Sequence, residues 1–438
     1  SLTLYHAGFR YAVVNVDSRE YPLRISLYHI VVIAYLSFQR MFQPIADSGN
    51  PAIGSHTLSY DAHTLLGAPP LYGGYEYTPL EMNKRSDVPL KEKNNESLLL
   101  MPRIFTEQAD FGAQVSDLSW ANYSWVPDMS ICAPYPKIEP YNLERKYTSK
   151  WLSERPDNVK ENTTSQTIKR NFLWFALFKE APVFLRESLY DDGSWWTSDE
   201  DYADIVEYIT KLSVLEYLPE LTDFSGKPNG NFVLLQSMVT HTSIELQAPN
   251  FDPSIKITDK GKFKWHPDND TISTNIAMLK RVAKWMDYLK ENGCYDNTRI
   301  IIVADHGAGR GGYAKNFFTE GSVIKDTGYL LDQNHPLLME KDFARSKNSV
   351  QSFTVDESFM TNADTPHLAL EGIIENPTNP WTGKAIEKRK ENAAYGVVAG
   401  GRYDPGKNGV YKYDLTGIKT YDVFDDMSKN SNWKERKE

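Results

Sequence analysis

Hydrophobic positions recur along the chain at two spacings, and the two spacings predict helices that alternate with strands. From Thr271 to Asn292 the apolar residues stand three and four positions apart, which predicts a helix with one apolar face. Gly293 follows in the position where helices commonly end. The run Ile300–Val303 comes next and is continuously apolar, as buried parallel strands are. This helix–strand pair is a candidate for a right-handed crossover unit.

The same patterns predict further elements on both sides of this pair. Strands are predicted at Phe9–Val16, Phe111–Val115 and Asn231–Met238, and helices at Glu96–Gln108, Thr167–Lys179 and Asp201–Leu218. Alternating helices and strands favour an α/β fold with a large, mainly parallel central β-sheet flanked by helices. Strand-like patches at Tyr395–Val398 and Thr420–Phe424 add a small C-terminal extension that contains β-structure, and the last nine residues are expected to fray.

The most apolar run, Leu27–Phe38, is shorter than the roughly 20 residues that a membrane-spanning helix needs. We interpret it as a buried helix, with the stub of a membrane segment as the alternative. The expected organisation is an N-terminal segment at 1–49, which is either the first strand or a membrane-proximal remnant, a catalytic domain at 50–384, and the extension at 385–438. The irregular region from about 134 to 230 is interpreted as an insertion on the sheet and not as a separate domain.

Composition excludes some classes of protein. The net charge of −10 argues against a nucleic-acid binder, because phosphate backbones reward clustered Lys and Arg. The two cysteines, Cys132 and Cys294, are too few for a disulfide framework and do not form a metal-binding pair. Hydrophobic residues make up 41% of the 438, which is enough for a sizeable core.

Candidate chemistry lies at the ends of predicted strands. Asp305 and His306 directly follow the run Ile300–Val303, and His241 follows the strand Asn231–Met238. Open α/β sheets place ligands at the carboxyl ends of their strands, and carboxylate and imidazole suit a divalent metal ion. Asp17 follows the first predicted strand and is either a turn or cap residue or a further metal-binding carboxylate.

A segment rich in Gly, Pro, His and Tyr, from about 42 to 79, reads as a functional loop on the scaffold. Within it, Thr64 precedes a short apolar turn, Leu65-Leu66-Gly67. Thr64 is either a helix cap or a nucleophile activated by a nearby metal ion. Thr57 offers a second His-Thr pair and is the weaker alternative nucleophile.

Four blocks of sequence resemble the alkaline phosphatase superfamily. They are HTLLGAPPLYGGYEYTP, NFVLLQSMVTHT, the helix running through YDNTRIIIVADHG, and FMTNADTPHLAL. The resemblance covers roughly Ser59 to Lys384. Within that superfamily the chain resembles the sulfatase-like branch that includes lipoteichoic acid synthases and other phosphoglycerol or phosphoethanolamine transferases. The resemblance implies an alkaline phosphatase or sulfatase-like sheet with a metal site at the strand carboxyl ends.

The resemblance also implies roles for individual residues. One divalent metal ion (manganese, zinc or magnesium) would be held by Asp305, His306, Thr64 and an acidic partner, for which Asp17 is the candidate. Thr64 would be the nucleophile and pass through a phospho-threonine intermediate, and His241 would contact the phosphoryl group. The implied enzyme is a metal-dependent phosphoryl-group transferase acting on a phospholipid-like head group, phosphoglycerol or phosphoethanolamine.

One departure from the family pattern keeps alternatives open. The segment between Asp17 and Thr64 matches the family poorly, so the acidic ligand could instead be missing and the protein a degenerate binding module. A phosphodiesterase or sulfuric-ester hydrolase is the other alternative. A sulfatase of the usual kind is disfavoured, because CAPYPK at Cys132 lacks the Arg of the C/S-x-P-x-R context.

Partners and location follow from the resemblance alone. They are a phospholipid or phosphodiester substrate, no nucleic acid, and membrane association through a region absent from this chain. The expected location is extracytoplasmic, periplasmic or at the cell surface, with the full-length protein anchored to the membrane.

Overall fold

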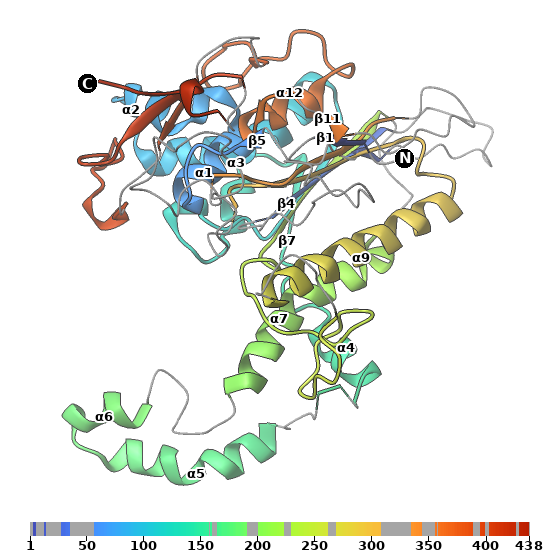
Figure 1. The fold of residues 1–438 in the computed structure, drawn as a ribbon, viewed down its shortest axis with the longest axis vertical. Coiled ribbons are helices and arrows are strands. Elements are labelled where there is room, and N and C mark those ends of the chain that lie inside the picture. Colours follow the sequence, from blue (N-terminus) through green and yellow to red (C-terminus); the bar gives the residue numbers. More distant parts are fainter. Residues whose placement is uncertain are drawn as a thin grey trace. The chain divides into compact units, whose positions relative to one another are not determined.

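The structure is a computed structural model that describes most of the chain. The described residues are 3–5, 13–14, 28–35, 57–156, 158–159, 164–190, 200–222, 229–261, 269–307, 334–343, 355–356, 358–388, 395–398, 403–425 and 429–437. The chain divides into two units. Figure 1 shows the fold, coloured from the N-terminus to the C-terminus. Unit 1 comprises residues 1–143, 219–241 and 282–438, and unit 2 comprises residues 144–218 and 242–281.

Unit 1 is built on a sheet that has nine strands in the described residues. Its strands are β1 (Thr3–Tyr5), β3 (Val13–Val14), β4 (Tyr28–Tyr35), β6 (Gly112–Ser116), β7 (Ile138–Tyr141), β8 (Gly230–Ser237), β9 (Thr298–Ala304), β10 (Leu338–Lys341) and β11 (Val355–Asp356). The order is β11-β1-β10-β9-β4-β8-β6-β7, and β3 also pairs with β9. The strands from β9 through β7 are parallel to one another, whereas β10 and β3 are antiparallel to β9. The predicted α/β fold with a mainly parallel sheet is therefore confirmed.

The prediction for Leu27–Phe38 is wrong. Residues Tyr28–Tyr35 of this run form β4, which lies between β8 and β9 and pairs in parallel with β9 from His29 opposite Thr298 to Tyr35 opposite Ala304. A short, continuously apolar run suits a fully buried parallel strand as well as a buried helix. Its β-branched residues favour a strand over a helix. Pairing with β9 then supplies backbone hydrogen bonds to this strand.

Helices and short strands complete unit 1. The helices are α1 (Thr64–Gly73), α2 (Pro79–Lys84), α3 (Leu90–Gln108), α12 (Thr365–Leu370) and, at the junction of the two units in sequence, α8 (Leu218–Leu221). The 3₁₀ turns are η1 (Tyr75–Tyr77), η2 (Ala121–Tyr123), η3 (Met129–Cys132), η6 (Asn362–Asp364), η7 (Pro405–Lys407) and η8 (Asn430–Asn432). Strands β5 (Thr57–Leu58) and β12 (Met360–Thr361) form a separate parallel pair. Figure 1 shows α1, α3 and α12 close together, and α1 contacts both of the others.

The core of unit 1 joins α1 and α3 to the sheet. Phe105 of α3 stacks on Phe232 of β8, with ring centroids 4.8 Å apart, and on Phe111. Leu66 of α1 and Val303 of β9 belong to the same buried cluster. Burying such side chains contributes about 1.5–3 kcal/mol each, so this cluster fixes α1 against the sheet.

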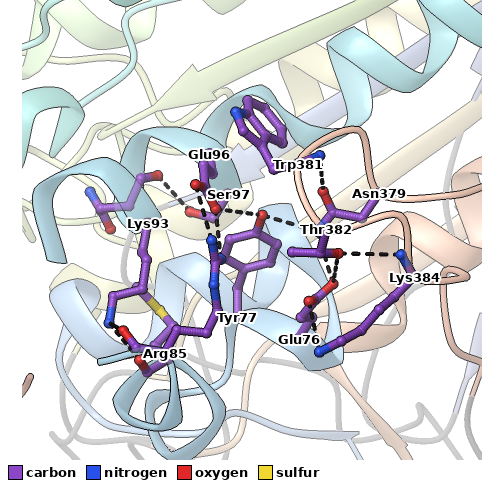
Figure 2. A network of polar contacts seen from close by, with 12 residues as sticks. Glu76, Tyr77, Arg85, Lys93, Glu96, Ser97, Asn379, Trp381, Thr382 and Lys384 are labelled. Carbon is purple, nitrogen blue, oxygen red and sulfur yellow. Dashed lines mark hydrogen bonds and ion pairs between the residues drawn. The ribbon is translucent and has the colours of Figure 1, made fainter. Parts of the chain in front are cut away.

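A polar network fixes the helices that follow α1 (Figure 2). Arg85 makes two hydrogen bonds to the Glu96 carboxylate, of 2.6 and 3.1 Å, and the Tyr77 hydroxyl donates to the same carboxylate at 3.0 Å. The Asn379 side-chain amide donates to the Tyr77 hydroxyl at 3.1 Å and to Glu76 at 2.8 Å. The network thereby links η1 and α3 to a loop that lies 303 residues beyond Glu76 in the chain.

The C-terminal residues form a small antiparallel sheet of β13 (Tyr395–Val398), β14 (Thr420–Val423) and β15 (Trp433–Glu435). The predicted β-containing extension is present. The predicted fraying of the last nine residues is wrong for β15, because Trp433 pairs with Val423 and its ring packs edge-on against Tyr421. Unit 1 includes residues on both sides of the predicted boundaries at 49/50 and 384/385.

Unit 2 is helical in its described part. It contains α4 (Thr148–Glu154), α5 (Thr164–Glu180), α6 (Val183–Tyr190), α7 (Glu200–Glu216) and α9 (Asn269–Glu291) up to Arg281. Its apolar core is formed by Trp151, Val159, Ile205, Ile209 and Tyr217. Buried Arg281 pairs with Glu216 at 3.0 Å and with Asp252. Most of the region interpreted as an insertion thus forms, with residues 242–281, a unit with its own core.

Candidate active site

Asp305 and His306 lie at the carboxyl end of β9. Asp305 is fully buried, and its Oδ1 accepts a hydrogen bond from the backbone N–H of His306 at 2.8 Å. The parallel strands β4, β8 and β6 end at the same edge of the sheet. This edge is where open α/β sheets bind their ligands, as the sequence analysis expected for this pair.

Thr64 reaches the pair from the first residue of α1. Its Oγ1 lies 3.3 Å from Nε2 of His306, although 242 residues separate the two in sequence. Both side chains are largely buried. His63 is the residue before the helix and makes no side-chain capping bond to it. Helix amino termini favour anions, and Thr64 is the first residue of this helix.

Two residues allow α1 to approach β9 this closely. A Cβ atom on Gly67 would lie 2.8 Å from the carbonyl oxygen of Asp305 and 3.2 Å from that of Asp61, so only glycine fits. The Asn362 side-chain amide donates to the carbonyls of Gly67, at 2.9 Å, and of Asp305, at 2.8 Å. Asn362 therefore joins α1 to the end of β9 directly behind the site.

Helix α1 is longer than its Gly and Pro content predicts. Pro69 has no N–H to donate to the Leu65 carbonyl, which would otherwise cost the helix a bond. The hydroxyl of Tyr413 donates to that carbonyl instead, at 3.4 Å. The helix ends at Gly74, whose φ of 75° suits glycine. A partner from the C-terminal part of the chain thus sustains a helix that local propensity disfavours.

The hydrogen bonds of His306 fix the state of its ring. Nδ1 lies 2.5 Å from the carbonyl oxygen of Gly307, which only accepts, so Nδ1 carries the proton. In the neutral ring Nε2 then presents its lone pair to Thr64 Oγ1. His306 is consequently arranged either to accept the hydroxyl proton of Thr64 or to bind a metal ion.

Three donor atoms of the site have spacings that fit a metal ion. Nε2 of His306 lies 3.3 Å from Thr64 Oγ1 and 3.5 Å from Oδ2 of Asp305. A tetrahedral ion with bonds of about 2.1 Å holds its ligand atoms about 3.4 Å apart. The donors are one carboxylate, one imidazole and one hydroxyl, and the described residues contain no group of three His, Cys, Asp or Glu that could hold a metal. The three residues thus fit part of a metal site, and a further charged ligand is not among the described residues.

A second Asp–His pair, which the sequence analysis missed, precedes Thr64. Nδ1 of His63 lies 2.7 Å from Oδ1 of Asp61, and the His63 backbone N–H donates to the same oxygen at 2.8 Å. Burial raises the pKa of Asp61, although His63 and, more weakly, His306 oppose this rise. The hydrogen bond to Asp61 raises the pKa of His63. The two residues stand two positions apart, immediately before a helix. The pattern Asp-x-His-Thr could therefore have revealed the pair in the sequence.

The other predicted residues are placed as follows. His241 follows β8 at the same sheet edge as Asp305, is exposed, and its ring centroid lies 5.4 Å from that of Trp125. Thr57 is buried in the β5–β12 pair. Asp17 lies outside the described residues, so its role stays a prediction. The nearest described residues before it, Val13 and Val14, pair with Arg299 and Thr298 at the amino end of β9, opposite to Asp305.

Comparisons with known proteins give structural likenesses alone. No protein-family model matches the chain, and no curated protein sequence matches it. The chain is similar to a crystal structure of the lipoteichoic acid synthase LtaP from Listeria monocytogenes, with 11% identity, a TM-score of 0.40, and 93% of this chain and 86% of that chain covered. It is also similar to a protein in the alkaline phosphatase superfamily from Vibrio parahaemolyticus, with 15% identity, a TM-score of 0.43, and coverage of 97% and 85%.

A third similar structure is the phosphonate monoester hydrolase of Agrobacterium radiobacter, with 11% identity, a TM-score of 0.40, and coverage of 93% and 88%. With such low identities and TM-scores, the function is inferred below from the side chains of the site.

Proposed function

We propose that this protein is an enzyme that transfers a phosphoryl group, with Thr64 as the nucleophile. The observation that carries the proposal is the 3.3 Å contact between Thr64 Oγ1 and the lone-pair nitrogen of His306. A threonine hydroxyl is a weak nucleophile until a neighbouring base or metal ion activates it. Thr64 is also the first residue of α1, and helix amino termini favour the charge of a phosphoryl group.

The reaction proceeds in two displacements. Oγ1 of Thr64 attacks phosphorus, the bond from phosphorus to the leaving oxygen breaks, and the leaving group departs with the electron pair. His306 Nε2 takes the Thr64 proton. An acceptor hydroxyl, from an alcohol or from water, then attacks phosphorus, and the bond from phosphorus to Thr64 Oγ1 breaks. His306 returns its proton to Oγ1, and the proton that the acceptor loses passes through water to the oxygen of the leaving group. Asp305 holds the backbone of His306 and hence its ring in place.

Thr64, His306 and Asp305 would also supply part of the ligand set of a divalent ion. When bound, such an ion supplies positive charge to the phosphoryl oxygens and acidifies the attacking hydroxyl. Asp17 remains the proposed acidic partner from sequence. We propose His241 as the group that contacts the phosphoryl oxygens, since it lies at the same sheet edge.

The proposed substrate is a phosphodiester of the phospholipid head-group kind, phosphoglycerol or phosphoethanolamine, and the proposed location is extracytoplasmic at the membrane. The motif blocks support this substrate class, and one of the similar structures is described as a lipoteichoic acid synthase. Hydrolysis in place of transfer requires only that water be the acceptor. A sulfatase that uses Cys132 is disfavoured, because Pro136 stands where the C/S-x-P-x-R context requires Arg.

Turnover of bis-p-nitrophenyl phosphate by matched isosteric variants tests the proposal. Thr64→Val keeps the shape of the side chain and removes the hydroxyl, so we expect turnover to fall by about a thousandfold or more. Thr57→Val makes the same change at the alternative nucleophile and should retain activity. The reverse pattern would assign the nucleophile to Thr57, and a folded wild-type protein without any turnover would identify a non-catalytic binding module.

A further inference from the structure

Exposed hydrophobic side chains gather on one helical hairpin of unit 2, formed by α5 and α6. Of the thirteen large hydrophobic side chains exposed in the described part of the chain, seven belong to this hairpin. They are Phe172, Leu173, Leu177, Val183, Phe184, Leu185 and Tyr190. Val183 and Phe184 are 79% and 80% exposed, and no residue of α6 is buried. Contiguous exposed apolar surface of this kind marks a binding face for a protein or a membrane.

The hairpin is held together by its own contacts. The Arg186 guanidinium donates to the backbone carbonyls of Ala181, at 3.0 Å, and Lys179, at 3.1 Å, and so satisfies the end of α5. The same guanidinium lies 5.7 Å from the ring of Phe178, which in turn contacts Tyr190 of α6. The exposed side chains therefore belong to a formed pair of helices, shown in Figure 1 as α5 beside α6.

The charge of the hairpin differs in sign from that of the protein. Residues 164–190 contain four cations, Lys169, Arg170, Lys179 and Arg186, against the anions Glu180 and Glu187, a net charge of 4 − 2 = +2. The whole chain carries −10. The hairpin thus combines apolar side chains with Lys and Arg. This combination complements a partner that has an apolar interior and a negatively charged surface. An anionic lipid bilayer has this chemistry.

The lengths of the helices decide how they meet a bilayer. α5 has 17 residues and α6 has 8, whereas a spanning helix needs about 20 predominantly apolar residues. A search of the described helices likewise found none that is long and apolar enough to cross a membrane. Amphipathic helices of this kind lie in the interface between head groups and acyl chains.

We propose that the α5–α6 hairpin is a docking element that lies on the surface of an anionic membrane, with Phe172, Leu173, Val183 and Phe184 inserted among the lipids. The inference rests on exposure and charge in unit 2 and does not depend on the reaction assigned to Thr64. It gives the described chain a membrane contact of its own, in addition to any anchor in another region.

Sedimentation of the full chain with phosphatidylglycerol–phosphatidylcholine vesicles tests the proposal. The wild type should bind these vesicles, and the double variant Val183→Asp/Phe184→Asp should lower its partition coefficient by tenfold or more, because two inserted apolar side chains become charged. Lys179→Glu should weaken binding by about tenfold on these vesicles and little on pure phosphatidylcholine. Val410→Asp is the matched control, since Val410 is equally apolar and 68% exposed but belongs to unit 1.

All of these positions are exposed, so thermal unfolding should be alike in every variant and a folding defect would be recognised. Vesicles that bind none of the proteins, or bind the double variant as well as the wild type, would overturn the proposal. Size-exclusion chromatography tests the alternative that a second copy of this chain covers the hairpin. A wild type that self-associates, a double variant that is monomeric, and no vesicle binding would identify the hairpin as an interface between copies of this chain.

Discussion

At the scale of single residues, the site depends on close backbone contacts between α1 and the end of β9. Gly67 lets α1 touch the end of β9, and Asn362 ties the two backbones together. Thr64 stands one turn before Gly67 on the same helix, so any displacement of α1 also displaces the proposed nucleophile. Reactions that need alignment to within a few tenths of an ångström are sensitive to such shifts.

Gly67→Ala should therefore impair catalysis more than its small size suggests. The added Cβ would lie 2.8 Å from the Asp305 carbonyl oxygen, which belongs to the backbone and cannot rotate away. We expect a loss of about 1–3 kcal/mol in the free energy of unfolding and a fall in turnover of about 10- to 100-fold. In Gly409→Ala the new Cβ meets only the Lys412 carbonyl, at 3.7 Å, and both quantities should stay near the wild-type values. Equal turnover in the two variants would show that α1 does not position Thr64.

Lys341 gives a prediction about pH. Its ammonium is buried beside β10 and donates to the carbonyls of Tyr295 and Thr298, and burial lowers its pKa to about 7. In the unfolded chain the pKa is about 10.4, so between pH 7 and 10 the unfolded state binds more protons than the folded state. Stability therefore gains from this group as the pH rises through that window, by up to about 1.4 kcal/mol per pH unit.

Urea unfolding at pH 7, 8 and 9 measures the effect against Lys341→Met, which has no titratable group at this position. The free energy of unfolding of the wild type, minus that of the variant, should increase with pH. A difference that stays constant over this range would mean that Lys341 keeps its ordinary pKa in the folded protein.

At the scale of elements, α1 is held from two sides by segments far along the chain. Tyr413 donates to the carbonyl that Pro69 leaves without a partner, and the network of Figure 2 fixes η1 and α3 beside it. The side chains of Arg85 and Glu96 are only 17% and 10% exposed. Removing one partner of such a pair leaves the other charge with little water to solvate it.

Glu96→Gln should consequently destabilise the protein by about 3 kcal/mol, because Arg85 and the Tyr77 hydroxyl lose a charged acceptor. Glu81→Gln makes the same substitution in the exposed pair of Glu81 with Lys84 and should cost less than about 0.5 kcal/mol. Denaturant unfolding of both variants compares the two pairs directly. Similar small losses would mean that the network drawn in Figure 2 contributes little to the free energy of unfolding.

At the scale of the whole molecule, catalysis and membrane contact are assigned to different units. Thr64, Asp305 and His306 belong to unit 1, and the α5–α6 hairpin belongs to unit 2. Turnover of a soluble substrate would need only the site in unit 1. Turnover of a lipid in a vesicle would also need the hairpin to hold the enzyme on the vesicle surface.

Val183→Asp/Phe184→Asp should therefore leave turnover of bis-p-nitrophenyl phosphate unchanged and reduce turnover of phosphatidylglycerol in vesicles by tenfold or more. Comparing the two substrates with the same preparation separates surface binding from chemistry. A parallel loss on both substrates would place the hairpin within the catalytic machinery and contradict the division of roles.

Local patterns in the sequence were sufficient for the elements that carry the site. The apolar spacing of α9, the continuous run of β9 and the position of Asp305-His306 at its end depend on neighbouring residues, and the structure has all three as predicted. The same holds for β8 ahead of His241, whereas the predicted helix cap at Thr64 is wrong, because His63 is the cap and Thr64 is the first helical residue. Residues within one turn or one strand determine these features, because hydrophobic periodicity is set by local geometry.

Only the tertiary structure decided the rest. β4 pairs in parallel with β9, and Tyr413 donates to the Leu65 carbonyl that Pro69 of α1 cannot reach with an N–H. The contact of Thr64 with His306 spans 242 residues, and the bridge made by Asn362 spans almost 300. No local pattern encodes such contacts, since they arise only when distant elements pack together. The sequence by itself therefore determined which groups could react, and the packing of α1 on β9 determined that they meet.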